Sequence, residues 1–391
     1  MALVSEHASP CDPLGGPDGG GQNVYVAGLA TELGLRGIEV TIYVRRHDLG
    51  LPSRVQFRPA VTIEYLNAGP CTMLAKDTLH PYMPAFAAGL RSRWAVNRPD
   101  IVHAHYWMSG LASLEGITAL RIPFVQTFHA LGIVKRRILR DQDTSPPERV
   151  SAETFLSRVA DAVVATSGDE LNELRRIEAL RHEISVVPCG VDTDLFSPDG
   201  PSESKSFRKR IVVVGRLVRR KGVDEVVRAL KWLPTVELMI VGGSGSSDPD
   251  AARIQAIAQA EGVADRVVLR GPLPNLEVPR VLRSADVVVC FPWYEPFGIV
   301  AIEAMACGRP VLAAAVGGLA ETVVPGTTGI LVAPRDPEGL ARAADSILQN
   351  ETECARMGEA GRRRAVKLYD WRHVVDRMLE VYTMAQRNQW V

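Results

Sequence analysis

The 391-residue sequence has no long apolar stretch that is free of charge and no net charge overall. Its most apolar later segment, residues 299–320, is interrupted by Glu303 and Arg309, which argues against a membrane span. The first residues reach Glu6 and His7 before any apolar core of signal-peptide length. We therefore expect a cytoplasmic protein.

The charge balance and the cysteine spacing exclude further classes. Lys+Arg and Asp+Glu each number 45, so nothing favours nucleic acid or an anionic membrane as a partner. The six cysteines form no C-x-x-C pair, which argues against a disulfide framework or a zinc site. The sequence contains no Walker motif, no nucleophile–base triad signature and no solenoid repeat. We expect small-molecule partners, and the oligomeric state stays open, a homodimer included.

Apolar runs of strand length alternate with helical segments along the chain, which predicts parallel sheets covered by helices on both faces. Strands are expected at residues 3–6, 39–44, 61–66, 101–106, 124–128, 162–166 and 184–188, and then at 211–214, 237–241, 267–269, 287–290, 311–314 and 330–332. The clearest helices are expected at residues 22–35, 84–96, 168–179, 337–348, 354–368 and 371–387.

One break interrupts this alternation. Residues 192–210 combine Pro, Gly, Ser and Lys with weak periodicity, as interdomain linkers do. We expect an N-terminal domain at 1–195, a C-terminal domain at 196–370, and a last helix at 371–391 that crosses back to the first domain. Two comparable α/β domains predict a cleft between them, which is a preferred position for ligands.

The stretch 291–310 follows a buried strand and turns through Pro and Gly into a helix. Glu295 precedes this helix and Glu303 lies inside it. Such a turn lies at the carboxyl edge of a sheet, where open α/β folds bind ligands. Three backbone N–H groups at the helix start would face an oxygen-rich ligand, namely those of Phe297, Gly298 and Ile299.

Two other turns could bind phosphate. The glycine-rich residues 15–21 join the first strand to the first helix, and they suggest a phosphate-binding or sugar-binding loop, with a flexible connection as the alternative. The basic turn 215–222 brings Arg216 and Lys221 to the carboxyl end of a strand. Charge-assisted hydrogen bonds from such residues to a diphosphate are worth about 1.5–3 kcal/mol each, whereas the alternative is a solvated basic turn.

Histidines and aspartates give weaker signals. His129 ends a strand, where it could bond a substrate or support a developing charge, or simply be structural. His103 and His105 share one face of a strand as metal ligands can, but no third ligand is identifiable, so core roles are favoured. Asp192 and Asp194 imitate a metal-binding D-x-D but open the linker, so we expect no essential metal.

Together these motifs resemble the retaining glycosyltransferases of family 4, which have the GT-B fold. The resemblance rests on Glu295-Pro-Phe-Gly298 with Glu303 as an E-x7-E element, on the diphosphate turn 215–222, and on Pro188-Cys-Gly-Val-Asp192. The first half is similar to the mycothiol-pathway N-acetylglucosaminyltransferases and the sucrose-phosphate synthases. The segments that carry this similarity are 18–26, 76–82, 103–106 and 127–131.

The resemblance implies two Rossmann-like domains facing a cleft and assigns three sets of residues. Residues that act on the reacting groups would be His129, Glu295, Arg216 and Lys221. Donor-binding residues would be Gly20, Gly21, Asp192, Phe297, Gly298, Ile299 and Glu303. Acceptor-binding residues would be Asn23, Lys76, Tyr106, Thr127 and Arg149. Arg216 and Lys221 would neutralise the donor diphosphate, Glu303 would bind the ribose, and Glu295 would bind the sugar.

The implied reaction is transfer of a hexose-type sugar from a nucleotide sugar to a small anionic or phosphorylated polyol or sugar. A UDP-sugar is favoured over a GDP-sugar as co-substrate, and no tightly bound cofactor is implied. One alternative is a GDP-sugar-dependent transferase with a non-phosphorylated acceptor. Two others are a GT-B enzyme that transfers nothing, such as an epimerase, and an inactive binding module.

Overall fold

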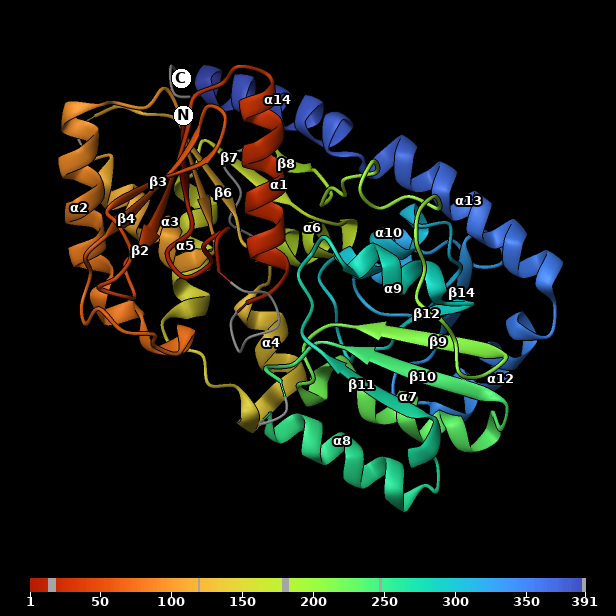
Figure 1. Ribbon diagram of the computed structural model, residues 1–391. Helices are drawn as coiled ribbons and strands as arrows, with labels where there is room; N and C mark the ends of the chain where they lie inside the picture. Colours follow the sequence, from red (N-terminus) through yellow and green to blue (C-terminus); the bar gives the residue numbers. More distant parts are fainter. Residues whose placement is uncertain (13–18, 119, 178–182, 246–247, 389–391) are drawn as a thin grey trace. The chain divides into compact units, whose positions relative to one another are not determined.

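The computed structural model describes residues 1–12, 19–118, 120–177, 183–245 and 248–388 of the chain (Figure 1). The chain divides into two compact units. Unit 1 contains Met1–Asp12, Gly21–Pro188 and Val374–Val391, and unit 2 contains Pro13–Gly20 and Cys189–His373.

The described part of unit 1 is built on an eight-stranded sheet with the order β3-β4-β2-β1-β5-β6-β7-β8. The strands are β1 (Ala2–Val4), β2 (Val40–Arg45), β3 (Arg54–Arg58), β4 (Val61–Leu66), β5 (Val102–His105), β6 (Phe124–Thr127), β7 (Ala162–Ala165) and β8 (Ile184–Val186). Neighbouring strands are parallel, apart from the antiparallel pair of β3 and β4.

Helices cover both faces of this sheet. They are α1 (Gly21–Leu35), α2 (Met83–Val96), α3 (Trp107–Gly116), α4 (Gly132–Leu139), α5 (Arg149–Val159), α6 (Gly168–Arg176) and α14 (Trp371–Asn388), with 3-10 turns η1 (Lys76–Thr78), η2 (His80–Tyr82) and η3 (Arg140–Gln142). Helix α14 joins unit 1 from Val374 on. Helix α3 packs against α2 and α5 on one face, and α1 covers the other (Figure 1).

Unit 2 contains, in its described residues, a six-stranded parallel sheet with the order β11-β10-β9-β12-β13-β14. The strands are β9 (Lys209–Val214), β10 (Val236–Val241), β11 (Val267–Gly271), β12 (Val287–Cys290), β13 (Val311–Ala314) and β14 (Gly329–Val332). Both units are therefore Rossmann-like α/β folds, as the sequence predicted.

The helices of unit 2 form two layers. They are α7 (Val223–Ala229), α8 (Pro249–Ala260), α9 (Val278–Ser284), α10 (Ile299–Ala306), α11 (Leu319–Thr322), α12 (Pro337–Leu348) and α13 (Glu351–Tyr369), with 3-10 turns η4 (Arg219–Lys221), η5 (Leu230–Trp232) and η6 (Ala264–Arg266). Helix α7 packs against α8 and α12, whereas α10 packs against α9 and α13 on the opposite face (Figure 1).

The strand orders explain where a site can form. In unit 1 the strands that follow β1 in the sequence (β2 to β4) lie on one side of it, and β5 to β8 lie on the other side. The loops after β1 and β5 therefore leave the carboxyl edge of the sheet in opposite directions. In unit 2 the same reversal occurs between β9 and β12. Ligands of open α/β sheets bind at such switch points. The turn that carries Lys221 follows β9, and the turn that carries Glu295 follows β12.

The structure corrects the sequence-based elements at three places. Strand β3 was not predicted, although its alternating exposed and half-buried residues are typical of an edge strand. The expected linker extended too far, because β9 already begins at Lys209. Arg210 is buried and forms an ion pair with the buried Glu237 (Nε to Oε1, 2.9 Å). The strand expected at 101–106 stops at His105, since Tyr106 has a φ of 82°.

Candidate active site

The two turns at the switch point of unit 2 are packed together through a glycine. Gly222 follows η4 with a φ of 70°, and a Cβ there would lie 1.8 Å from the carbonyl oxygen of Phe291. A side chain at this position would therefore push the turns apart. The close packing brings Lys221 Nζ and Glu295 Oε2 into an ion pair.

Both members of this pair are charged groups in a partly buried setting. Their side chains are 25% and 18% exposed. Burial lowers the pKa of Lys221, against the raising effect of Glu295. Burial also raises the pKa of Glu295, but the charge of Lys221 and its hydrogen bond outweigh it, so the pKa of Glu295 is below its usual range. An anionic diphosphate would compete with Glu295 for the same ammonium group.

The start of α10 has the shape that the sequence predicted. Gly298 has a φ of 98°, and a Cβ there would lie 2.4 Å from Leu319 Cδ2. A backbone hydrogen bond holds the loop before α10, because the N–H of Gly318 donates to the carbonyl oxygen of Glu295 (3.0 Å). No described residue accepts a hydrogen bond from the N–H groups of Phe297, Gly298 and Ile299. This helix end can therefore bind oxygen atoms of a ligand.

Glu303 lies on α10 and is 6% exposed. Among the described residues no charged group offsets its burial. Burial raises its pKa to about 8. The carboxyl group is therefore largely protonated at neutral pH, and it can donate to or accept from a hydroxyl group.

The remaining predicted donor residues lie outside the turns after β9 and β12; they are Gly20, Gly21 and Asp192. A Cβ at Gly20 would lie 3.8 Å from Arg216 Nε, and both residues belong to unit 2. Gly21 is the first residue of α1 in unit 1. Asp192 is exposed, and its Oδ1 accepts from the N–H groups of Asp194 (3.0 Å) and Leu195 (2.9 Å). Asp192 thus has a local turn-capping role in addition to any role toward a sugar.

In unit 1 three of the five predicted acceptor residues lie together at an aromatic ring. Tyr106 is 4% exposed and follows β5. Lys76 Nζ lies 5.2 Å and Arg149 Cζ 4.9 Å from the centroid of its ring. Both distances are within cation–π range. Tyr106 and His129 also have positive φ values, 82° and 62°, and strained backbone of this kind clusters at functional sites.

Arg149 is fixed by a carboxylate that the sequence analysis did not single out. It is 1% exposed, and its Nε donates to Glu153 Oε1 (2.7 Å) one turn along α5. Glu153 Oε2 accepts from the N–H of Gly132 (2.7 Å), and Arg149 Nη2 donates to the carbonyl oxygen of Ala130 (2.6 Å). The i,i+4 spacing of Arg149 and Glu153 was the available signal.

The other two predicted acceptor residues are enclosed. Thr127 has no exposed surface, and its Oγ1 lies 2.8 Å from His103 Nε2. Asn23 is 3% exposed, and its Nδ2 donates to the carbonyl oxygen of Ser9 (2.9 Å). Of the five predicted acceptor residues, Lys76 is the partly exposed one. An acceptor would therefore have to displace side chains in order to reach the set.

Three histidines, the buried His103 and His105 of β5 and His129 after β6, have neighbouring rings. His105 Nδ1 lies 3.1 Å from His129 Nε2, and the ring centroids of His103 and His105 are 4.2 Å apart. Burial lowers the pKa of His103 and of His129 to about 3 and that of His105 well below its ordinary value. These rings are therefore neutral at physiological pH. Within the described ranges, His, Cys, Asp and Glu form no cluster that could hold a metal ion.

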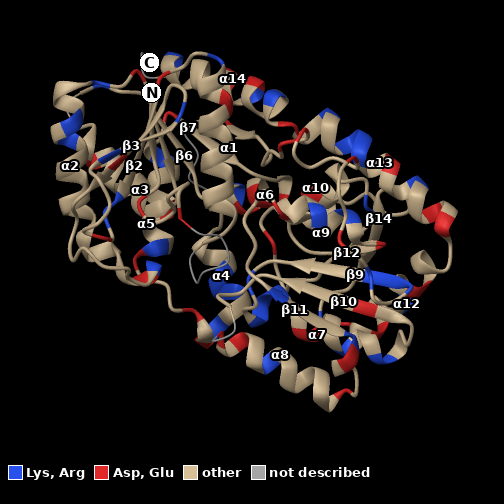
Figure 2. Ribbon diagram, in the orientation of Figure 1, with Lys and Arg blue, Asp and Glu red and all other residues tan. Residues whose placement is uncertain are grey.

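Two surface properties complete the description. Basic and acidic residues both occur along α13 and α14 (Figure 2), in keeping with the equal numbers of the two signs. None of the helices between residues 1 and 388 that the structure describes is long and apolar enough to span a bilayer.

Two Rossmann-like units with a basic turn after β9 and an E-x7-E element after β12 are typical of GT-B glycosyltransferases. Two family models match the chain, Glycosyltransferase Family 4 at residues 19–195 and Glycosyl transferases group 1 at residues 199–364. The D-inositol 3-phosphate glycosyltransferase of Xylanimonas cellulosilytica is 36% identical over 407 residues, covering 100% of this chain and 97% of that protein. That of Mycolicibacterium smegmatis is 35% identical, covering 99% and 92%. The chain belongs to glycosyltransferase family 4 and is an enzyme of that class.

Solved structures agree with this assignment. Sucrose-phosphate synthase from Thermosynechococcus elongatus has a TM-score of 0.91 and 32% identity, with 98% of each chain covered. HepE from Anabaena, solved in complex with UDP-glucose, has a TM-score of 0.76 and 19% identity, again with 98% of each chain covered. The sucrose-phosphate synthase is similar to this chain in both fold and sequence, whereas HepE is similar in fold alone.

Proposed function

We propose that this protein transfers a hexose-type sugar from a UDP-sugar to a phosphorylated small polyol, with retention of the anomeric configuration. Inositol phosphate is the favoured acceptor, since the full-length relatives above are named for D-inositol 3-phosphate. A GDP-sugar is the alternative donor.

The observation that carries the proposal is the pair of cations at one aromatic ring. Lys76 and Arg149 both lie within about 5 Å of the Tyr106 ring. Two carboxylates offset part of this charge, Glu153 in its ion pair with Arg149 and Asp77, which pairs with a third cation, Lys135 (Oδ2 to Nζ, 3.1 Å). A phosphate monoester carries up to two negative charges and several acceptor oxygens, so it fits two adjacent cations better than a neutral polyol does.

On the donor side, Arg216 and Lys221 supply positive charge for a diphosphate. They provide in fixed form the charge that a metal ion supplies in other enzymes, so we expect activity to persist in the presence of a chelator. The N–H groups at the start of α10 and the Glu295 carboxylate would bind sugar hydroxyls, and Glu303 would bind the ribose.

Catalysis would rest on fixed charges and dipoles. In front-face substitution the leaving phosphate oxygen takes the acceptor proton, so the protein need not supply a general base. An oxocarbenium-like transition state with a departing diphosphate is then stabilised by Lys221, Arg216 and the α10 N-terminus. His129 is neutral and would act by hydrogen bonding.

The predicted domain roles follow from this distribution. The five predicted acceptor residues lie in unit 1, and the predicted diphosphate and E-x7-E residues lie in unit 2. We propose that residues 1–195 bind the acceptor, residues 196–370 bind the nucleotide sugar, and the final segment 371–391 supports the first domain. We also propose a cytoplasmic location, where nucleotide sugars are made.

One transfer assay tests the proposal. Purified protein is incubated with UDP- and GDP-hexoses and with inositol phosphate, fructose 6-phosphate or unphosphorylated inositol. Products are identified by mass spectrometry, and the anomeric configuration by NMR. We expect a product with a UDP-sugar and a phosphorylated acceptor only. Fructose 6-phosphate is included because the similar Thermosynechococcus protein is a sucrose-phosphate synthase. Equal transfer to unphosphorylated inositol would contradict the proposal.

A further inference from the structure

One residue of unit 2 is hydrogen-bonded to the chain on both sides of Lys221. The backbone N–H of Trp293, in the turn after β12, donates to the carbonyl oxygen of Arg220 (2.9 Å). Its indole Nε1 donates to Glu225 Oε1 (3.4 Å), in the first turn of α7. Arg220 directly precedes Lys221, and Glu225 follows it four residues later. Trp293 therefore holds the turn after β9 at two points, one on each side of the predicted diphosphate ligand.

A cation from a third segment covers the indole ring. Arg335 Cζ lies 4.1 Å from the centroid of the Trp293 ring, which is within cation–π range. Arg335 follows β14 and has a φ of 61°, in a region that residues other than glycine seldom adopt. It is exposed, whereas Trp293 is half-buried. The guanidinium thus lies over the negative face of the ring and restrains its orientation.

The carboxylate of Glu225 depends on the indole N–H. Its Oε2 is buried and has no hydrogen-bond partner among the described residues, and its Oε1 accepts from Trp293. Leaving a partly buried carboxylate without a donor is costly. The contact with Trp293 therefore favours a fixed distance between α7 and the turn after β12.

The ion pair of Lys221 and Glu295 does not fix this geometry by itself. Lysine carries its ammonium group on a flexible four-carbon stem, so Lys221 can follow Glu295 when the turns shift. An indole has only two side-chain torsions, and those of Trp293 are restrained by Arg335 and Glu225. Trp293 also lies two residues before Glu295 in the same turn. Its position therefore determines where both members of the pair lie.

We propose that Trp293 is a positioning residue that holds Lys221 and Glu295 at the separation that a donor diphosphate and its sugar require. This inference rests on the proposed function, which assigns the diphosphate to Lys221 and the sugar to Glu295. Arg335 and Glu225 hold the indole ring and act through it. All three contribute to donor affinity without touching the donor.

The first test measures the ion pair in the absence of a ligand. In protein labelled with 13C at the glutamate carboxyl groups, the Glu295 signal, assigned with Glu295→Gln, gives the pKa of this group by NMR titration. Burial raises this pKa, whereas Lys221 and, to a smaller extent, Arg220 and Arg216 lower it. Trp293→Ala lets Lys221 move away, so the pKa of Glu295 should rise. An unchanged pKa would overturn the proposal.

The second test is kinetic and uses milder variants, so it does not depend on the folding of Trp293→Ala. Trp293→Phe keeps a ring for Arg335 and loses the N–H, and it should lower kcat/KM for the donor about five-fold, the effect of one hydrogen bond. Arg335→Ala should lower it about three-fold, the effect of an exposed cation–π contact, and Arg335→Lys should restore most of the loss. Acceptor KM should change less than about two-fold. Lower thermal stability with unchanged donor kcat/KM would mean a merely structural role and would sink the idea.

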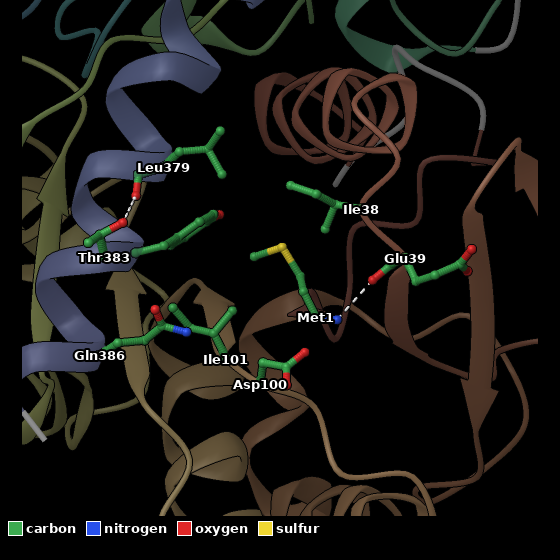
Figure 3. Close-up of a pocket in the computed structure, with 9 residues that line it drawn as sticks. Met1, Ile38, Glu39, Asp100, Ile101, Leu379, Thr383 and Gln386 are labelled. Atoms are coloured by element: carbon green, nitrogen blue, oxygen red, sulfur yellow. Dashed lines mark hydrogen bonds between the residues drawn. The ribbon is translucent and has the colours of Figure 1, made fainter.

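Trp232→Ala is the matched control. Trp232, in η5 of the same unit, also forms a cation–π pair, with Lys231 Nζ 4.2 Å from the centroid of its ring, but it lies outside both turns. Thr383→Val is the control in unit 1, where the hydroxyl donates to the carbonyl oxygen of Leu379 (2.9 Å) at a surface cavity of about 400 Å³ (Figure 3). Both variants should leave donor kcat/KM unchanged.

Calorimetry with UDP separates this proposal from the proposed function. If the wild-type protein binds no UDP, the proposed function fails, and the pKa of Glu295 in Trp293→Ala still decides whether Trp293 positions the ion pair. If the wild-type protein binds UDP and Trp293→Ala changes neither UDP affinity nor that pKa, the positioning role is wrong.

Discussion

Lys221 and Glu295 form an ion pair that joins the turn after β9 to the turn after β12 in unit 2. One partner is predicted to bind the donor diphosphate and the other the donor sugar. The same two side chains therefore neutralise each other in the ligand-free protein. Donor binding would exchange the partner of Lys221 from a carboxylate to a phosphate and release Glu295 toward the sugar.

Replacing Glu295 with Gln should separate binding from turnover. We expect kcat to fall about 10²-fold, the size of effect seen when one preorganised transition-state contact is lost. Affinity for free UDP should stay the same or increase slightly, because Lys221 no longer has a competing carboxylate. Calorimetry with UDP and steady-state kinetics measure the two effects. Glu338→Gln, which removes one partner of an exposed ion pair with Arg342, is the control. A large loss of UDP affinity would contradict the assignment.

Replacing Lys221 with Ala should weaken UDP binding about 10- to 100-fold, the range for a charge-assisted hydrogen bond. It should also change the pH dependence. Lys221 now helps to keep the pKa of Glu295 below its usual range, and without it burial, which raises that pKa, is opposed only by the charges of Arg220 and Arg216. Glu295 then becomes protonated at a higher pH, so the acid limb of the kcat profile should move upward. Lys221→Arg should restore most of the wild-type profile; an unmoved acid limb in the Ala variant would argue against the pairing.

Glu303 should make stability depend on pH. Its carboxyl pKa is about 8 in the folded chain against an ordinary value of 4.5, so the folded state holds the proton more tightly. Its stabilising contribution to the free energy of unfolding is fully present below about pH 4.5. This contribution is lost as pH rises toward 8, by at most about 1.4 kcal/mol per pH unit. Glu303→Gln should flatten this slope in urea unfolding at several pH values. An unchanged slope would rule out the raised pKa.

Replacing Lys76 with Ala tests the acceptor side. Lys76 is the partly exposed cation near the Tyr106 ring, so its loss should raise acceptor KM about ten-fold or more, while donor KM changes less than about two-fold. Initial rates at varied acceptor and fixed donor, and the reverse, give both values. Arg91→Ala, which breaks an exposed ion pair with Glu115 on the same unit, should change neither. An equal rise of both KM values would remove Lys76 from the acceptor set.

The sequence alone determined the fold class and the position of the main loops. Strand-length apolar runs alternate with helical periods, and this local pattern is enough to predict parallel sheets covered by helices. It placed β4, β12 and β13 at their observed bounds. Gly298 was predicted at the start of a helix, and the structure places it there with a positive φ. Motifs of this kind are local, so they can be read from neighbouring residues.

Only the tertiary structure decided which distant side chains meet. Lys221 and Glu295 are 74 positions apart, and Tyr382 and His103 are 279 apart. Such contacts depend on strand order and on which face of the sheet a helix covers, and hydrophobic periodicity encodes neither. The pKa of Glu303 is raised because the fold buries it without a charged partner, which no spacing in the sequence reveals. The sequence therefore defined the class of enzyme, and packing defined the charge state of its site.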